Sequence, residues 1–106
     1  MRRICSFIIN DRLYTIYEVD KIEGKKSYIG QTQYDVRTIY IEEGNFEEML
    51  FTLKHELMHV WLYEHGHKNQ GNGETFSYEE LCEYVAYSNN FINRIVEKYL
   101  RAKNNC

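Results

Sequence analysis

Two short runs of β-branched and aromatic residues open the chain. They cover residues 4–9 and 14–19, and the turn formers Asn10 and Asp11, followed by Arg12, separate them. Strand-forming residues on both sides of a short polar break are typical of a β-hairpin. The sequence therefore predicts two paired strands near the N-terminus.

Two more candidate strands follow. Residues 20–26 are polar and contain a glycine, which predicts a second turn. Residues 27–30 come next, and residues 36–42 alternate threonine and tyrosine with isoleucine, the pattern of a strand with one buried face. We expect residues 1–44 to form a small antiparallel sheet.

The hydrophobic period lengthens to three or four residues after Asn45. That asparagine is a favourable N-cap, and residues 46–64 contain neither proline nor glycine, which predicts one uninterrupted helix. Its apolar positions fall on one stripe, so we expect that face to pack in the core. The stripe comprises Leu53, Leu57, Val60 and Trp61.

A second helix is predicted for residues 77–101. Ser77 followed three residues later by Glu80 is a capping-box pattern, which marks a helix start. Beyond it an apolar stripe recurs at threes and fours, comprising Tyr78, Leu81, Cys82, Val85, Asn89, Ile92, Val96 and Tyr99. A sheet followed by two long helices is an α+β fold, and residues 1–106 suit a single domain.

The motif His55-Glu56-Leu57-Met58-His59 lies inside the first predicted helix. Positions i and i+4 stack on one helix face, so the two imidazoles point the same way and can bind one divalent ion. Glu56 is then placed to take a proton from a water that the metal activates and to deliver it to a leaving amine. The pattern is typical of zinc hydrolases.

A hydrolytic zinc site has three protein ligands and one open position, so a third ligand is needed. Glu79 follows His59 by 20 positions and lies on the first turn of the second helix, whereas His65 follows by 6 positions, just past the first helix. Glu83 lies one turn after Glu79. There it can accept a hydrogen bond from a ligating histidine and fix the tautomer of that ring.

These residues resemble a known group of enzymes. The motif at residues 55–59, followed by residues 79–83, is similar to the gluzincin arrangement of thermolysin-type metallopeptidases. Residues 54–64 and 78–86 resemble the short ImmA/IrrE-type metallopeptidases of bacteria, phages and mobile elements. The resemblance covers residues 46–90, roughly half of the 106 residues.

The resemblance implies a role for each matching residue. His55, His59 and Glu79 become zinc ligands, Glu56 the general base and Glu83 the acidic partner of a ligand. It implies a zinc metalloendopeptidase that acts on a protein or peptide, with a phage or mobile-element regulator such as a repressor as target. Members of the family often carry additional helices or a DNA-binding domain. This length leaves no room for either, so we expect a minimal version.

Other interpretations of the same residues stay open. In a metzincin-like site His65 is the third ligand, but that family has a glycine where this chain has Leu62, and no methionine follows Met58 to form its methionine turn. Otherwise His65 and His67 are loop residues near the cleft or in solvent. Glu79 can also belong merely to an acidic first helical turn, which the helix dipole favours.

The function itself has alternatives to a peptidase. The chain can be a zinc-binding interaction module or a latent peptidase without turnover, in which a protein group such as Cys106 fills the fourth metal position. An ordinary α+β domain with a chance motif is the remaining interpretation. A small ligand such as a hydroxamate distinguishes an open site from a closed one.

The connection between the two helices is rich in glycine, asparagine and histidine. It covers residues 65–76 and joins both ligand-bearing helices, so we expect it to form one rim of a substrate cleft. An exposed sheet edge at residues 36–42 is expected to form the other rim. Such an edge pairs with an extended substrate by strand addition.

Charge and composition narrow the classes further. A net charge of −3, a pI near 5.8 and isolated basic pairs argue against a nucleic-acid binder. The apolar run at residues 4–9 is too short for a signal peptide or a membrane span. Cys5, Cys82 and Cys106 form no disulfide framework, so a cytoplasmic protein is expected, with Cys82 as a small buried hydrophobe.

Overall fold

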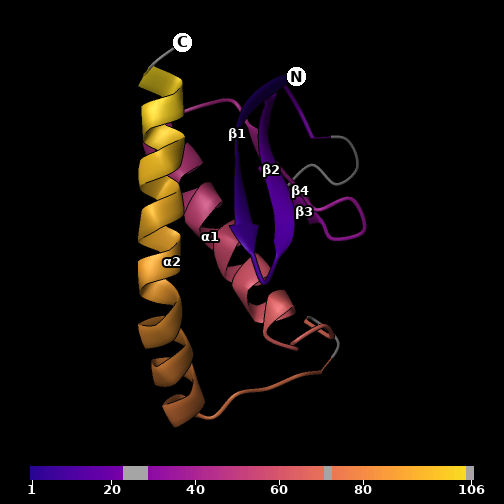
Figure 1. Ribbon diagram of the computed structural model, residues 1–106, viewed down its shortest axis with the longest axis vertical. Helices are drawn as coiled ribbons and strands as arrows, with labels where there is room; N and C mark the ends of the chain where they lie inside the picture. The colour runs from indigo at the N-terminus through magenta and orange to yellow at the C-terminus, as the bar shows by residue number, and fades with distance from the viewer. Residues whose placement is uncertain (23–28, 71–72, 105–106) are drawn as a thin grey trace.

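The computed structural model describes residues 1–22, 29–70 and 73–104. Its elements are β1 (Arg2–Ile9), β2 (Arg12–Val19), β3 (Gly30–Gln33), β4 (Thr38–Glu42), α1 (Phe46–Glu64) and α2 (Tyr78–Asn104). Both helices pack against one face of the sheet, α1 over β3 and β4 and α2 over β1 (Figure 1). The predicted α+β fold, a sheet followed by two long helices, is confirmed.

The sheet is mixed, so the prediction of a purely antiparallel sheet was wrong in one pairing. β1 pairs antiparallel with β2, and β3 antiparallel with β4, but β2 and β4 run parallel in the centre. The strand order is therefore β1-β2-β4-β3. β4 carries the isoleucines that suit a buried centre, whereas the polar sequence of β3 suits an edge.

This order also corrects the predicted sheet edge. β4 covers most of residues 36–42 and lies inside the sheet, so the edge beside α1 is β3. β3 overlaps the predicted strand at 27–30 only at Gly30, and residues 27–28 lie outside the described residues, as do residues 23–26 of the predicted turn. A Gly-Gln-Thr-Gln strand has no hydrophobic alternation by which the sequence reveals it.

The N-terminal hairpin matches its prediction. Ile9 pairs with Arg12, which leaves Asn10 and Asp11 as a two-residue turn with φ of 53° and 62°. Turns with two positive φ angles fit the twist of paired strands, and asparagine and aspartate tolerate that conformation. The turn chemistry in the sequence was therefore a reliable signal.

Helix α1 has the predicted bounds and the predicted cap. The Asn45 side chain accepts hydrogen bonds from the backbone of Glu47 at 2.9 Å and Glu48 at 3.3 Å. The predicted apolar stripe of α1 is buried in the core, as expected. The innermost side chains of this layer are Tyr14, Ile16, Ile39, Ile41, Leu53, Leu57 and Val60.

A buried carboxylate fixes the C-terminal end of α1 to the hairpin. The Tyr14 hydroxyl donates a hydrogen bond of 2.5 Å to Glu64, whose other oxygen lies 3.5 Å from the Arg12 guanidinium. Burial and the neighbouring Glu64 raise the pKa of Tyr14, so the phenol stays protonated as the donor. The contact holds α1 in register with the sheet.

A second buried carboxylate fixes the C-terminal half of α2. Glu18 of β2 accepts hydrogen bonds from Tyr99 at 2.7 Å and Lys103 at 2.8 Å, and Arg2 lies 3.3 Å away. Burial by itself raises the pKa of Glu18, but these hydrogen bonds and positive charges hold it below its usual value. The anchored half of α2 therefore lies at the β1–β2 side of the sheet.

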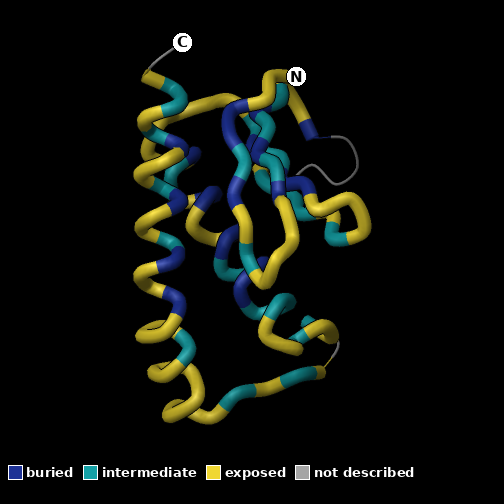
Figure 2. Tube along the Cα trace, in the orientation of Figure 1, coloured by how far each residue is buried: buried dark blue, intermediate teal, exposed yellow. Residues whose placement is uncertain are grey.

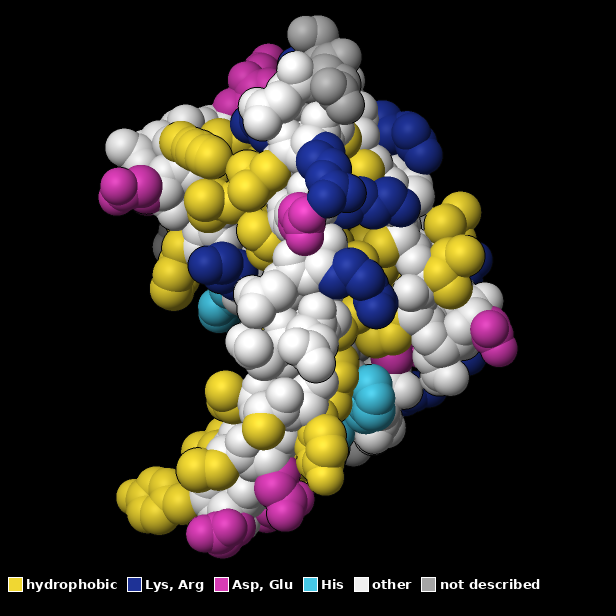
Figure 3. Space-filling view, turned by 60° about the vertical axis from the view of Figure 1, so that its left-hand side comes forward, with side chains coloured by type: hydrophobic (Ala, Val, Ile, Leu, Met, Phe, Trp, Pro, Cys, Tyr) yellow, Lys and Arg dark blue, Asp and Glu magenta, His cyan; other side chains and the backbone are white. Residues whose placement is uncertain are grey.

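The N-terminal half of α2 differs from the prediction. The buried positions of the whole helix are Ser88, Phe91, Ile95 and Tyr99, with Ile92 and Val96 half-buried beside them. The first turns extend past the rest of the molecule, and their apolar and acidic side chains are exposed (Figures 2 and 3). The exposed members of the predicted stripe are Tyr78, Leu81, Cys82, Val85 and Asn89.

The prediction of a buried stripe was wrong for these residues, because the sequence does not show how far the first turns of α2 extend past α1 and the sheet. Cys82, expected to be a small buried residue, lies beyond the part of α2 that packs on the core. The predicted capping box is present, because Ser77 and Glu80 exchange side-chain to backbone hydrogen bonds of 3.0 and 3.1 Å. These bonds hold the pKa of Glu80 below its usual value.

Strand β3 and helix α1 lie very close together at Gly30. A Cβ atom at that position would lie 2.4 Å from the Thr52 methyl carbon and 3.2 Å from the Glu56 side chain. Thr52 is buried, and its hydroxyl donates to the Glu48 carbonyl at 2.7 Å, so the methyl group has little freedom to move. The sheet edge can lie this close to α1 because residue 30 is glycine.

We expect Gly30→Ala to lower the free energy of unfolding by about 1–3 kcal/mol, the usual range for overpacking. The added methyl group must push β3 away from α1. Gly44→Ala is the matched control, because a Cβ there meets nothing within 4 Å. Urea denaturation of both variants measures the difference, and equal stability of the two would contradict the close approach.

Candidate metal site

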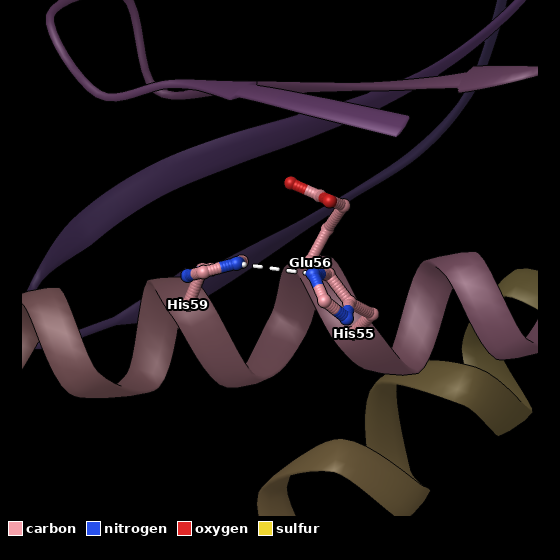
Figure 4. Close-up of side chains that lie close together, drawn as sticks. All are labelled: His55, Glu56 and His59. Atoms are coloured by element: carbon pink, nitrogen blue, oxygen red, sulfur yellow. Dashed lines mark hydrogen bonds between the residues drawn. The ribbon is translucent and has the colours of Figure 1, made fainter. Parts of the chain in front are cut away.

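Helix α1 brings His55 and His59 together on its face away from the core. Their Nε2 atoms lie 3.1 Å apart, as the dashed line in Figure 4 marks. Two nitrogens bound to one tetrahedral zinc at about 2.0–2.1 Å lie about 3.3 Å apart. Among the described residues these histidines and Glu56 form the single group of three whose possible ligand atoms all lie within 4.8 Å. This group can hold a metal ion.

Glu56 reaches from α1 toward the sheet edge. The residue is 7% exposed, and its Oε1 accepts a hydrogen bond of 2.8 Å from the hydroxyl of Thr32 in β3. In Figure 4 its carboxylate points toward the strands, beside the histidine pair. The edge strand therefore fixes the orientation of the acidic residue in the motif.

Gln70 contacts the His59 ring at Nδ1, the ring nitrogen that does not face His55. Its Oε1 lies 2.6 Å from Nδ1 of His59, and its Nε2 donates to the backbone carbonyls of His59 at 3.1 Å and His67 at 3.0 Å. Because Gln70 belongs to the connection between the helices, this connection contacts a candidate metal ligand directly. In the sequence Gln70 was one polar residue among many in that segment.

A cleft of about 400 Å³ opens over these residues. Its lining includes Thr32 and Tyr34 from β3 and the residues after it, Lys68 and Gln70 from the connection, and the histidine pair with Glu56 from α1. The connection therefore contributes to one rim, as expected. The other rim is β3 and not residues 36–42, because β4 lies inside the sheet.

Tyr34 adds a protonated phenol to the cleft. Its ring stacks on Tyr63 with centroids 4.1 Å apart, and it is hydrogen-bonded to Gln70. Burial and the negative charge of Glu56 raise the pKa of Tyr34 to about 12, although the Gln70 contact acts in the opposite direction. At neutral pH the hydroxyl is therefore a hydrogen-bond donor beside the candidate metal site.

Glu79 and Glu83 are not part of the group that the structure brings together. α2 packs on α1 through Tyr84, whose ring lies 5.8 Å from that of Trp61. Trp61 follows His59 by two residues, about 200° around the helix, so α2 lies on the opposite side of α1 from the histidines. Both glutamates are exposed on the first turns of α2. Their roles as ligand and partner stay predictions.

His65 and His67 lie outside the group as well. His65 stacks on Trp61 at a centroid distance of 4.1 Å, and its Nδ1 lies 2.7 Å from the Trp61 carbonyl oxygen. His67 pairs with Glu74 at 2.7 Å and contacts the ring of Tyr84. Both histidines therefore fasten the connection to the helices in this structure.

Three residues of the site were missed by reasoning from the sequence. Thr32, Tyr34 and Gln70 all contact the motif or line its cleft, but each comes from a segment without hydrophobic periodicity. No spacing rule links them to the motif. The polar character of residues 30–34 suits the edge of a sheet, but it does not single out Thr32 or Tyr34 as site residues.

Comparisons with known proteins return no match: no family model, no curated protein and no solved structure is significantly similar to this chain. The resemblance to ImmA/IrrE-type metallopeptidases therefore stays a prediction carried by the residues themselves. Within residues 1–22, 29–70 and 73–104, neither helix is both long and apolar enough to cross a membrane.

We expect one zinc ion per chain in protein purified without chelator, measured by mass spectrometry of the metal content. Zinc should be lost in His59→Ala, which removes one of the paired nitrogens, and, as the resemblance implies, in Glu79→Ala. It should be kept in His65→Ala, whose ring is stacked elsewhere. Full zinc content in Glu79→Ala would remove Glu79 as the third ligand.

Proposed function

We propose that this chain is a zinc-dependent metallopeptidase that hydrolyses peptide bonds in a protein substrate. The observation that carries the proposal is the histidine pair, with Nε2 atoms 3.1 Å apart, next to a buried glutamate in the lining of one cleft. Nitrogen donors in this number and spacing suit zinc, and the adjoining carboxylate supplies the base that hydrolysis needs.

His55 and His59 would hold the ion. Glu79 is the proposed third ligand by the resemblance, and this role would require the first turns of α2 to lie closer to the histidine pair than they do in this structure. When bound, zinc supplies a Lewis acid that polarises a peptide carbonyl and lowers the pKa of a water toward about 7. Glu56 takes the proton from that water and returns it to the leaving amine. The hydrogen bond from Thr32 keeps one carboxylate oxygen of Glu56 directed, which leaves the other free for proton transfer.

Tyr34 is the proposed donor to the negative charge that develops on the carbonyl oxygen. Its hydroxyl is protonated at neutral pH, and its side chain lines the cleft beside Glu56. Donors directed at a developing oxyanion contribute strongly in a site that excludes water. Stacking on Tyr63 limits the motion of the phenol, so little ordering is required during the reaction.

The proposed substrate is an extended peptide segment that pairs with β3. In the part of the chain that the structure describes, β3 has a strand neighbour on one side, and its residues border the cleft. Backbone hydrogen bonds to such an edge align a substrate without requiring a particular sequence. A regulator of a phage or mobile element in the cytoplasm is the proposed target, by the resemblance described above.

We expect Glu56→Gln to abolish peptide hydrolysis while zinc remains bound, because an amide cannot accept the proton. Activity against a peptide library and metal content are measured on the same preparation. Glu47→Gln is the control, since Glu47 is exposed on the first turn of the same helix. A fully active Glu56→Gln protein would eliminate the mechanism.

A zinc-binding interaction module is the second candidate. It is favoured by one observation, that Glu79 does not accompany the histidine pair in the structure. In such a module a further protein group closes the coordination, so a hydroxamate does not compete for the metal. Zinc binding without turnover and without hydroxamate binding would support the module over the peptidase.

We expect Tyr34→Phe to lower kcat by about 10²–10³-fold, the usual effect of removing one oxyanion donor. Zinc content should be unchanged, because the hydroxyl is not a proposed ligand. Tyr40→Phe is the control, because Tyr40 stacks on Tyr17 outside this cleft. Equal kcat values for Tyr34→Phe and the wild type would assign the donor role to another group.

A further inference from the structure

We propose that Gln70 is a positioning residue of the candidate metal site. It holds the His59 ring with its proton on Nδ1, and thereby directs the lone pair of Nε2 toward His55 and the proposed metal. This inference rests on the proposed function for its consequence, metal binding, but the state of the His59 ring can be measured without any metal.

The orientation of the Gln70 amide follows from its partners. Two backbone carbonyl oxygens, those of His59 and His67, lie 3.1 and 3.0 Å from one end of the amide. Carbonyl oxygens only accept hydrogen bonds, so the atom between them must be the NH₂ nitrogen. The opposite end, which lies 2.6 Å from the His59 ring, is therefore the amide oxygen.

The state of the His59 ring follows from that orientation. An amide oxygen is an acceptor, so Nδ1 of His59 must carry a proton to form the 2.6 Å hydrogen bond. In the neutral ring Nε2 is then unprotonated, and this nitrogen lies 3.1 Å from Nε2 of His55. This is the tautomer that a metal ligand bound through Nε2 requires.

Gln70 also links the metal site to the connection between the helices. The His67 carbonyl binds the Gln70 amide, while the His67 ring pairs with Glu74 and contacts Tyr84 of α2. The connection is thereby fastened to both helices around the residue that holds His59. Metal affinity should accordingly depend on Gln70 although its side chain is not a ligand.

The experiment compares wild type, Gln70→Ala, Gln70→Glu and the control Asn69→Ala, an exposed neighbour. Long-range ¹H–¹⁵N spectra of the metal-free proteins at about pH 8, above the usual histidine titration range, report which ring nitrogen carries the proton. Cobalt and zinc titrations then measure metal affinity. Gln70→Glu keeps an acceptor for Nδ1 and is the rescue variant.

We expect the proton on Nδ1 of His59 in wild type, Asn69→Ala and Gln70→Glu, and loss of this preference in Gln70→Ala. Metal affinity should fall about 10–100-fold in Gln70→Ala and be partly restored by Gln70→Glu, which keeps the acceptor for Nδ1 but loses the donor bonds to the two carbonyl oxygens. A proton on Nε2 in the wild type, or an unchanged ring state in Gln70→Ala, would overturn the proposal. If wild type binds no metal but its ring state depends on Gln70, the positioning role stands and the peptidase fails.

Discussion

The close approach of the sheet edge to α1 is the constraint on which the site depends. At Gly30 the backbone of β3 lies so near α1 that no side chain fits between them. Two residues further along the strand, this proximity puts the Thr32 hydroxyl 2.8 Å from Glu56. A strand held one side-chain layer further away would leave the Glu56 carboxylate without its donor and widen the cleft. The packing of β3 on α1 and the orientation of Glu56 therefore both depend on Gly30.

The two sides of the motif are supported by different parts of the chain. Glu56 is oriented by the sheet edge through Thr32, whereas His59 is oriented by the helix connection through Gln70. The helix itself supplies the spacing of His55 and His59, because residues four apart stack on one face. Each element thus contributes one constraint, and the cleft lies where the three meet.

Local signals in the sequence predicted local structure well. The bounds of α1, the Asn45 cap, the Asn10-Asp11 turn and the capping box at Ser77 all depend on neighbours within four residues, and all are present. The position of β3 and the parallel pairing of β2 with β4 depend on contacts between distant segments. A short polar strand has no period of its own, so the sequence contained no signal for it. The histidine pair was predictable for the same local reason, and Thr32 and Gln70 were not.

The position of α2 bears on two separate properties of the site, which are the pairing of the two histidines and the supply of a third ligand. The histidine pair and Glu56 are arranged by α1, β3 and Gln70, and α2 touches this arrangement where Tyr84 contacts His67. α2 is held at the β1–β2 side by Glu18 and packs on the Trp61 face of α1. The pairing of the two imidazoles therefore depends mainly on α1, β3 and the connection between the helices. The two proposed functions differ in what they require of the exposed first turns of α2. The proposed peptidase needs Glu79 from those turns as a third ligand, whereas the proposed interaction module does not.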